Sequence, residues 1–350
     1  MFRSRFPEIP HRQRKGITLC RHLALCMSMA ALILAGAWTL PGAAQAAPPK
    51  ALSFSGGSPG GNYNLLTTAL SPLLVQGPSK ISVFPEGSTG SPENIRRTQS
   101  GETDMALGFA SDLVEAWNGE GRFKSPHKKI RALAYMDANI AHVVTLAKSN
   151  ITSFEQLYDK KLALGPQGSG SSMNIERLLR QLGAWDRVRS KAVYQGAMDA
   201  SQALKDGHID AYNWHVNIGN ATYHDTASTY DIRIIDLDTP ARASGFYKKY
   251  PFYTPFTIPG GIYRSVNAPV KTFATPTFWI VNESFPEDRV FELLSVAFSD
   301  GVIRRMHDAV GLTAQKNYGK DKALQGVPIP LHPGAIKYWK SQGFTVPDVR

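Results

Sequence analysis

The sequence predicts an α/β protein, and two features of the chain support this prediction. From residue 48 onward, short apolar runs alternate with helical patterns, which is typical of mostly parallel sheets covered by helices. A strand, a glycine-rich loop and a helix also follow one another twice, over residues 52–75 and again over residues 161–182. We therefore expect two lobes with one such loop on each.

The first glycine-rich loop, residues 56–62, lies between a predicted strand at 52–55 and a predicted helix at 63–75. Glycine has no Cβ, so the main-chain N–H groups of such a loop can approach a ligand closely. The unpaired N–H groups and the dipole at the start of the helix favour an anion such as a carboxylate. The expected ligand contacts here are Ser58, Gly60, Gly61, Asn62 and Tyr63.

The next predicted elements are a strand at 80–86 and a helix at 92–100. Proline is favoured at the first position of a helix, and Gly101 is suited to the end of this one. Ser91 and Asn94 stand at the start of the helix. We expect both to hold the preceding loop and to contact the ligand.

A short buried strand is predicted at 104–109, and Ser111-Asp112 is predicted to cap a helix at 113–117. Residues 129–135 and 141–147 predict two strands separated by a polar turn, where the chain first crosses between the lobes. At 152–157 the sequence resembles a capping box that opens a short helix.

The second glycine-rich loop, residues 165–172, follows a predicted strand at 161–164 and precedes a predicted helix at 173–182. Gly168 and Gly170 allow a close approach of the backbone, and Ser169 and Ser171 carry hydroxyls that could donate hydrogen bonds to a carboxylate. The two serines could instead serve only to cap the helix. We expect these four residues to contact the ligand.

A helix at 197–206 and strands at 208–214 and 232–237 follow. Trp214 and His215 are candidates for ligand specificity, although neighbouring side chains on a strand face opposite sides, so at least one of them is expected to be structural.

The segment 251–263 is rich in aromatic residues, Pro and Gly, and it predicts the return crossing and part of a pocket wall. Tyr253 is the expected ligand contact in it. A buried strand at 273–281 and helices at 286–299, at 301–310 and up to residue 340 complete the chain.

The N-terminal 46 residues have the pattern of a secretory signal peptide. Six Lys or Arg residues precede an uncharged apolar run at 23–40, and Ala44-Gln45-Ala46 forms an A-x-A cleavage site. A retained membrane anchor is the alternative, but Pro41-Gly42 and the small residues after it fit cleavage better. We expect export to the periplasm.

Charge and cysteine content exclude several functions. Both cysteines, Cys20 and Cys26, fall inside the predicted signal, so the mature chain has no disulfide, zinc-thiolate site or cysteine nucleophile. The net charge of the whole chain is +11, of which the first 46 residues carry +5 (six Lys or Arg, one Glu), leaving +6. No run of five or more basic residues and no interleaving of aromatic and basic residues is present, so we expect no nucleic-acid partner.

Several motifs together resemble a known family. They are Gly57-Ser-Pro-Gly-Gly-Asn-Tyr63, Gly90-Ser-Pro-Glu-Asn94, Gly165-Pro-Gln-Gly-Ser-Gly170, Ile258-Pro-Gly-Gly-Ile-Tyr263 and Pro330-Leu-His-Pro-Gly-Ala335. In this order, over residues 50–340, they resemble the TAXI group of solute receptors of TRAP transporters. One departure is Tyr212-Asn-Trp-His-Val-Asn217, where the family usually has small and glycine-rich residues. It puts glutamate or a simple dicarboxylate in doubt and leaves an aromatic or polar ligand open.

The resemblance implies a periplasmic-binding-protein-like fold of type II, with the ligand cleft between two lobes. Lobe one would comprise residues 47–139 and 254–350, and lobe two residues 140–253. The implied function is capture of a small organic acid or amino acid and its delivery to TRAP membrane permease subunits. We expect a monomer without cofactor, metal or catalytic residue.

Two alternatives remain open at this point. Gly56-Gly-Ser-Pro-Gly60 matches the G-x-S-x-G pattern of hydrolases, with Ser58 as nucleophile, although the match follows the first strand instead of several. A receptor that signals without a transporter is the other alternative. Neither glycine-rich loop matches a nucleotide-binding motif, and the histidines lack the spacing of metal ligands.

Overall fold

A single mixed sheet organises the computed structural model, which describes residues 51–311 and 317–349. The signal peptide predicted at 1–46 lies outside these residues. The strands are β1 (Leu52–Ser55), β2 (Val83–Glu86), β3 (Met105–Phe109), β4 (Ile130–Leu146), β5 (Leu162–Ala163), β6 (Ala211–Val216), β7 (Ile232–Ile234), β8 (Thr254–Ile258) and β9 (Val270–Asn282). Their order is β2-β1-β3-β9-β4-β6-β5, with β7 paired to β4 and β8 to β9.

The pairing of the strands corrects the expectation of mostly parallel sheets. Among the described strands, β1 is parallel to β2 and β3, and β5 is parallel to β6. Every pair that involves β4 or β9, the two long strands, is antiparallel. The α/β class is confirmed, but the sheet is mixed because these two strands run through it in opposite directions.

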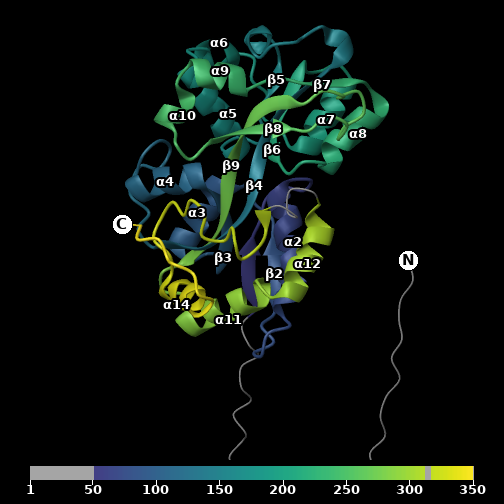
Figure 1. Ribbon diagram of the computed structural model, residues 1–350. Coiled ribbons are helices and arrows are strands. Elements are labelled where there is room, and N and C mark those ends of the chain that lie inside the picture. Colours follow the sequence, from purple (N-terminus) through teal and green to yellow (C-terminus); the bar gives the residue numbers. More distant parts are fainter. Residues whose placement is uncertain (1–50, 312–316, 350) are drawn as a thin grey trace, which may run out of the picture. The chain divides into compact units, whose positions relative to one another are not determined.

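β4 and β9 run side by side from one group of helices to the other (Figure 1). β4 is one strand of 17 residues, so the prediction of two strands with a polar turn between them is wrong. Asp137 and Asn139, the polar residues of the supposed turn, are fully buried. They stay in the strand because Asn62 donates a hydrogen bond to each of them, at 3.1 Å in both cases.

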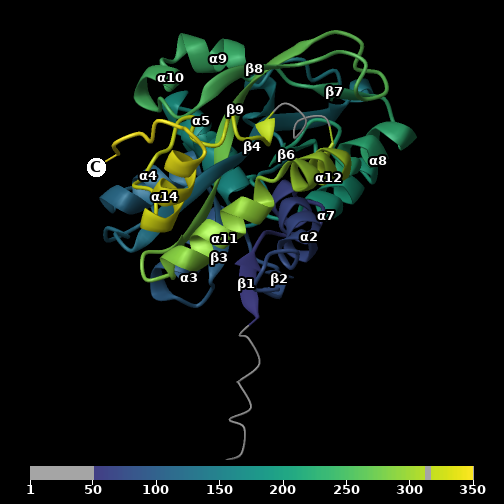
Figure 2. The same ribbon diagram turned by 60° about the horizontal axis from the view of Figure 1, so that its bottom comes forward.

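One lobe surrounds β1, β2 and β3, and we call it the β1 lobe. Its helices are α2 (Asn62–Leu74), α3 (Ser91–Ser100), α4 (Ala110–Asn118), α11 (Glu287–Ala297), α12 (Asp300–Val310) and α14 (Pro333–Ser341). In Figure 2, α11 and α12 lie next to α2. The core of this lobe includes Phe54, Leu70, Trp279 and Trp339, and α2 contributes Leu66, Leu70 and Leu74, which share one helical face.

The other lobe surrounds β5, β6, β7 and β8, and we call it the β6 lobe. Its helices are α5 (Gly170–Gln181), α6 (Trp185–Arg189), α7 (Ala197–Lys205), α8 (Ala221–Thr229), α9 (Asp238–Ala243) and α10 (Phe246–Lys249), with 3-10 turns at η2 (Ala147–Ser149) and η3 (Glu155–Leu157). Its buried residues form cores separate from those of the β1 lobe, around Tyr212 and Tyr223 and around Phe246 and Phe273. The fold is therefore a two-lobed α/β fold in which β4 and β9 connect the lobes.

Three local predictions need correction. Ser111 and Asp112 do not cap α4, because the helix starts earlier, at Ala110, and its N-cap is Phe109. The strand predicted at 208–214 begins later, at Ala211. Residues 254–258 of the predicted pocket wall form β8, a strand paired with β9. Within the described residues no helix is long and apolar enough to span a membrane.

Candidate ligand-binding site

A small cavity lies where the glycine-rich loops of the two lobes meet. Its volume is about 40 Å³. The β1 lobe contributes Gly57, Ser58, Gly61, Asn62, Tyr63, Thr89, Gly90, Ser91 and Phe109, β4 contributes Asn139, and the β6 lobe contributes Ser169, Gly170, Ser171, Trp214 and His215.

The N-cap residues of four helices line this cavity. They are Gly61 of α2, Gly90 of α3, Phe109 of α4 and Ser169 of α5. Each helix start presents unpaired N–H groups and the positive end of a dipole. Among the described residues that line the cavity there is no Lys, Arg, Asp or Glu, so these helix starts dominate its electrostatics and favour a negatively charged ligand.

The contact between the second glycine-rich loop and Phe109 requires glycine at position 170. A Cβ there would lie 2.5 Å from Cδ2 of Phe109, which is too close for any side chain. Gly170 begins α5 in the β6 lobe and Phe109 precedes α4 in the β1 lobe. The second glycine-rich loop thus lets one lobe pack against the other at the edge of the cavity.

Three lining residues carry buried polar atoms without a hydrogen-bond partner in the described part of the chain. These atoms are Oδ1 of Asn62, the hydroxyl of Tyr63 and both ring nitrogens of His215. Burial raises the pKa of Tyr63 well above its usual value. Burial lowers the pKa of His215 to about 3, so its imidazole is neutral at physiological pH.

A buried ion pair joins the lobes beside the cavity. Nη2 of Arg177, on α5, lies 2.8 Å from Oδ1 of Asp112 and 2.7 Å from Oε2 of Glu115, both on α4. The side chains are 7%, 0% and 15% exposed, respectively. Burial raises the pKa of Asp112, and the charge of Arg177 opposes that rise. Asp112 thus binds the opposite lobe instead of capping its own helix.

Most, but not all, of the predicted ligand contacts lie together. Ten of them line the cavity, namely Ser58, Gly61, Asn62, Tyr63, Ser91, Ser169, Gly170, Ser171, Trp214 and His215. Their contact with a ligand remains a prediction. Trp214 and His215 both line it although they are neighbours on β6.

The other four have structural surroundings. Asn94 donates hydrogen bonds to the carbonyl oxygens of Gly56 and Leu107, at 2.7 and 2.8 Å. Tyr253 donates to Oδ1 of Asn174 at 2.6 Å and accepts from Arg177 at 3.1 Å. Gly60 and Gly168 have φ angles of +78° and +74°. This left-handed backbone conformation by itself explains why glycine occurs at both positions, and no ligand contact is needed to explain it.

Sequence reasoning missed five lining residues, namely Gly57, Thr89, Gly90, Phe109 and Asn139. Gly57 and Gly90 belong to the motifs at residues 57–63 and 90–94, so these motifs could have identified both glycines as lining residues. Asn139 was assigned to a turn. Phe109 reads as an ordinary core residue, and only the packing of the lobes brings it to the cavity.

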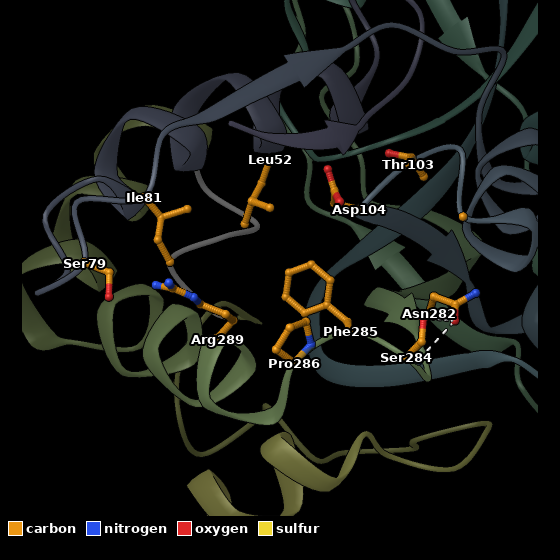
Figure 3. A pocket seen from close by; sticks show the side chains of 11 residues that line it. Leu52, Ser79, Ile81, Thr103, Asp104, Asn282, Ser284, Phe285, Pro286 and Arg289 are labelled. Carbon is orange, nitrogen blue, oxygen red and sulfur yellow. Dashed lines mark hydrogen bonds between the residues drawn. The ribbon is translucent and has the colours of Figure 1, made fainter. Parts of the chain in front are cut away.

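A larger cavity of about 480 Å³ lies elsewhere in the β1 lobe (Figure 3). Leu52, Ile81, Phe285 and Pro286 line it together with Arg289. No residue of the β6 lobe reaches it, and none of its described lining side chains carries a buried polar atom without a partner. The smaller cavity is therefore the better candidate. Within the described residues, no three His, Cys, Asp or Glu side chains lie close enough together to hold a metal ion.

Comparison with solved structures finds matches that cover most of this chain and most of the matched chain, at low sequence identity. The malate-bound MatC of Rhodopseudomonas palustris is 16% identical, over 76% of this chain and 91% of MatC, with a TM-score of 0.49. PhnD1 of Prochlorococcus marinus, in complex with methylphosphonate, is 16% identical over 75% and 91% of the two chains, also with a TM-score of 0.49. The periplasmic aliphatic sulphonate binding protein SsuA of Escherichia coli is 14% identical over 76% and 81%, with a TM-score of 0.41.

Comparison with family models identifies the family. The model of the NMT1-like family matches residues 54–343. The match covers both lobes and all four helix starts of the cavity. The chain belongs to the NMT1-like family.

Proposed function

We propose that the chain is a periplasmic solute receptor that captures a small carboxylate-bearing ligand and closes its lobes around it. The observation that carries this proposal is the convergence of four helix starts, three from the β1 lobe and one from the β6 lobe, on a cavity without charged side chains. Because both lobes contribute donors, a carboxylate bound there stabilises the closed arrangement over an open one.

The boundaries of the lobes belong to this proposal. The sequence predicts residues 47–139 and 254–350 for one lobe and 140–253 for the other. Ile258, Tyr263 and Phe273 pack into the cores of the β6 lobe, which favours a second crossing inside β9 instead of at residue 254. β4 and β9 would then act as the hinge.

Delivery to TRAP membrane permease subunits is the finer part of the proposal, and the motif order that resembles the TAXI group supports it. The predicted signal peptide supports a periplasmic location. A signalling receptor without a transporter would have the same cleft. Co-purification of the exported chain with TRAP permease subunits separates the two, because only a transport receptor should bind them.

The hydrolase alternative receives little support from the cavity. Ser58 donates a hydrogen bond to the carbonyl oxygen of Ser88 at 3.3 Å. His215 is the histidine that lines the cavity, but neither of its ring nitrogens has a hydrogen-bond partner among the described residues. A serine nucleophile needs a base within hydrogen-bond reach, and Ser58 has none in this arrangement.

A thermal-shift screen tests the proposed function. The exported protein is mixed with amino acids, dicarboxylates, 2-oxoacids, 2-hydroxy acids and aromatic acids, with and without calcium. A ligand at one hundred times its Kd adds about 2.7 kcal/mol of stability. We expect a carboxylate to raise Tm, and Ser169→Ala to reduce that rise. Absence of any rise, together with ester hydrolysis that Ser58→Ala abolishes, would favour the hydrolase.

A further inference from the structure

The unpartnered atoms of the cavity narrow the class of ligand. Oδ1 of Asn62, the hydroxyl of Tyr63 and the ring nitrogens of His215 belong to side chains that are 2%, 6% and 2% exposed. A buried polar group without a partner destabilises the protein. A ligand whose own donors and acceptors match these atoms therefore gains affinity over one that leaves them unpaired.

Asn62 can offer only an acceptor to the ligand. Its Nδ2 donates to Oδ2 of Asp137 and to Oδ1 of Asn139. Asn139 is itself oriented, because its Nδ2 donates to the hydroxyl of Thr277. These bonds fix the amide of Asn62 with its nitrogen toward β4, and its carbonyl oxygen, which can only accept, remains without a partner. The ligand must bring a hydrogen-bond donor to pair with it.

The ring nitrogens of His215 also lack hydrogen-bond partners among the described residues, so His215 too favours a polar group on the ligand. Its neutral imidazole has one donor and one acceptor nitrogen. The nearest rings are those of Phe109 and Phe273, with centroids 6.4 and 5.5 Å from that of the imidazole, and neither can satisfy a ring nitrogen. A hydroxyl group has one hydrogen to donate and can also accept, so it can accept a hydrogen bond from the N–H nitrogen of His215 and donate its hydrogen to the carbonyl oxygen of Asn62.

The charges around the cavity exclude two other ligand classes. An ammonium group would face four positive helix ends, and the buried carboxylate behind Gly170, that of Asp112, is already paired with Arg177. A second carboxylate would need a further cation. Arg177, whose charge is felt at His215, is already bound by Asp112 and Glu115. The site therefore balances one negative charge.

We propose that the ligand is a small hydroxy acid with a single carboxylate. The carboxylate binds at the four helix starts, and the hydroxyl binds His215 and Asn62, with His215 determining specificity. This inference rests on the proposed receptor function. A volume of about 40 Å³ holds roughly three water-sized groups, which favours the smallest acids; lactate, with six non-hydrogen atoms, would need the lobes to move slightly apart.

Isothermal titration calorimetry on the exported protein tests the inference with four three-carbon probes, namely lactate (both enantiomers), pyruvate, alanine and malonate. Pyruvate lacks the hydroxyl donor, alanine carries an ammonium group, and malonate carries a second carboxylate. We expect one enantiomer of lactate to bind at least tenfold more tightly than each of the other three.

Variants of His215 locate the source of that preference. In His215→Phe the preference for lactate over pyruvate should fall but not disappear, because the hydroxyl loses one of its two partners and keeps Asn62. His215→Gln, which keeps a donor and an acceptor, should retain part of the preference, and it serves as the second variant if His215→Phe does not fold. His208→Phe alters an exposed histidine and should leave the ratio unchanged.

The outcomes separate this inference from the receptor proposal. Pyruvate, alanine or malonate binding as tightly as lactate overturns the hydroxy-acid class but leaves the receptor standing. An unchanged ratio in both His215 variants overturns the role of His215. Binding of none of the four probes overturns the hydroxy-acid inference, and the absence of any hit in the thermal-shift screen overturns the receptor as well.

Discussion

Arg177→Met should shift the lobes from the closed arrangement toward an open one. The variant keeps most of the side-chain volume but leaves Asp112 and Glu115 without their cation, and Asp112 is fully buried. Removing one partner of a buried ion pair costs about 3–5 kcal/mol. In an open arrangement water would hydrate both carboxylates, so the loss falls on the closed state. At about 1.4 kcal/mol per tenfold change, the ratio of closed to open molecules should fall by roughly two to three and a half orders of magnitude.

Spin labels can measure this shift directly. Cys20 and Cys26, the cysteines of the chain, both lie in the predicted signal peptide, so a labelled pair introduced into the exported chain would be unique. Arg96 on α3 and Thr229 at the end of α8 are exposed and belong to different lobes. Double electron–electron resonance between labels at Arg96→Cys and Thr229→Cys should give a longer mean distance when Arg177→Met is added.

Two further variants make the test decisive. Arg187 pairs with Asp159 inside the β6 lobe, with side chains 57% and 61% exposed, so Arg187→Met should change the distance little. Asp112→Leu combined with Arg177→Met replaces the charged pair by apolar side chains and should restore part of the closed population. An unchanged distance in Arg177→Met, or an equal change in Arg187→Met, would refute the ion pair as the contact that holds the lobes together.

Three other changes test the site. His215→Gln should reduce acid destabilisation, because the pKa of His215 falls to about 3 on folding, so between about pH 6.5 and pH 3 only the unfolded chain binds the proton. In urea unfolding, the loss of stability between pH 7.5 and 5.5 should be about 1.4 kcal/mol smaller in the variant than in the parent. An equal loss in both proteins would count against a buried neutral imidazole. Gly170→Ala should lower thermal stability by about 1–3 kcal/mol because of the contact with Phe109, whereas Gly301→Ala, with open space around its Cβ, should be neutral or slightly stabilising. Asn94→Ala should lower the free energy of urea unfolding by about 1–3 kcal/mol, because the hydrogen bonds from its side chain to the backbone are lost. The affinity for lactate should stay within twofold of the parent. A large loss of affinity without a loss of stability would contradict the structural role of Asn94.

The glycine-rich loops could be predicted from the sequence because their determinants are local. The strand at 52–55 and the helices at 63–75 and 92–100 are confirmed as β1, α2 and α3, within a residue at each end. Gly101 ends α3 in the left-handed conformation, as expected. Glycine, proline and runs of apolar residues act on their own neighbours, so such elements do not depend on contacts that are distant in the sequence.

The long strand β4 could not be predicted in the same way. Asp137 and Asn139 have the local preferences of a turn, and they remain in a strand because of partners from α2 and β9. Burial raises the pKa of Asp137 to about 6, a cost that the hydrogen bonds from Asn62 and Asn317 partly offset. Such compensation comes from residues far along the chain and leaves no local pattern.

The ion pair between the lobes escaped prediction for the same reason. Asp112 and Arg177 are 65 positions apart. Asp112 stands near the start of α4, where capping is common, and Arg177 stands two turns into α5, where a solvent-facing role is common. Only α5 follows a segment that the sequence assigns to the cleft, the second glycine-rich loop, so the sequence offered no signal that α4 would bring Asp112 to it.

A crystal structure of the exported protein grown with lactate is the most direct test of the central claim. We expect the carboxylate within hydrogen-bond distance of the N–H groups at the starts of α2, α3, α4 and α5, and the hydroxyl at His215 and Asn62. Electron density for lactate beside Arg289, in the larger cavity between Leu52 and Phe285, with the four helix starts unoccupied, would contradict it.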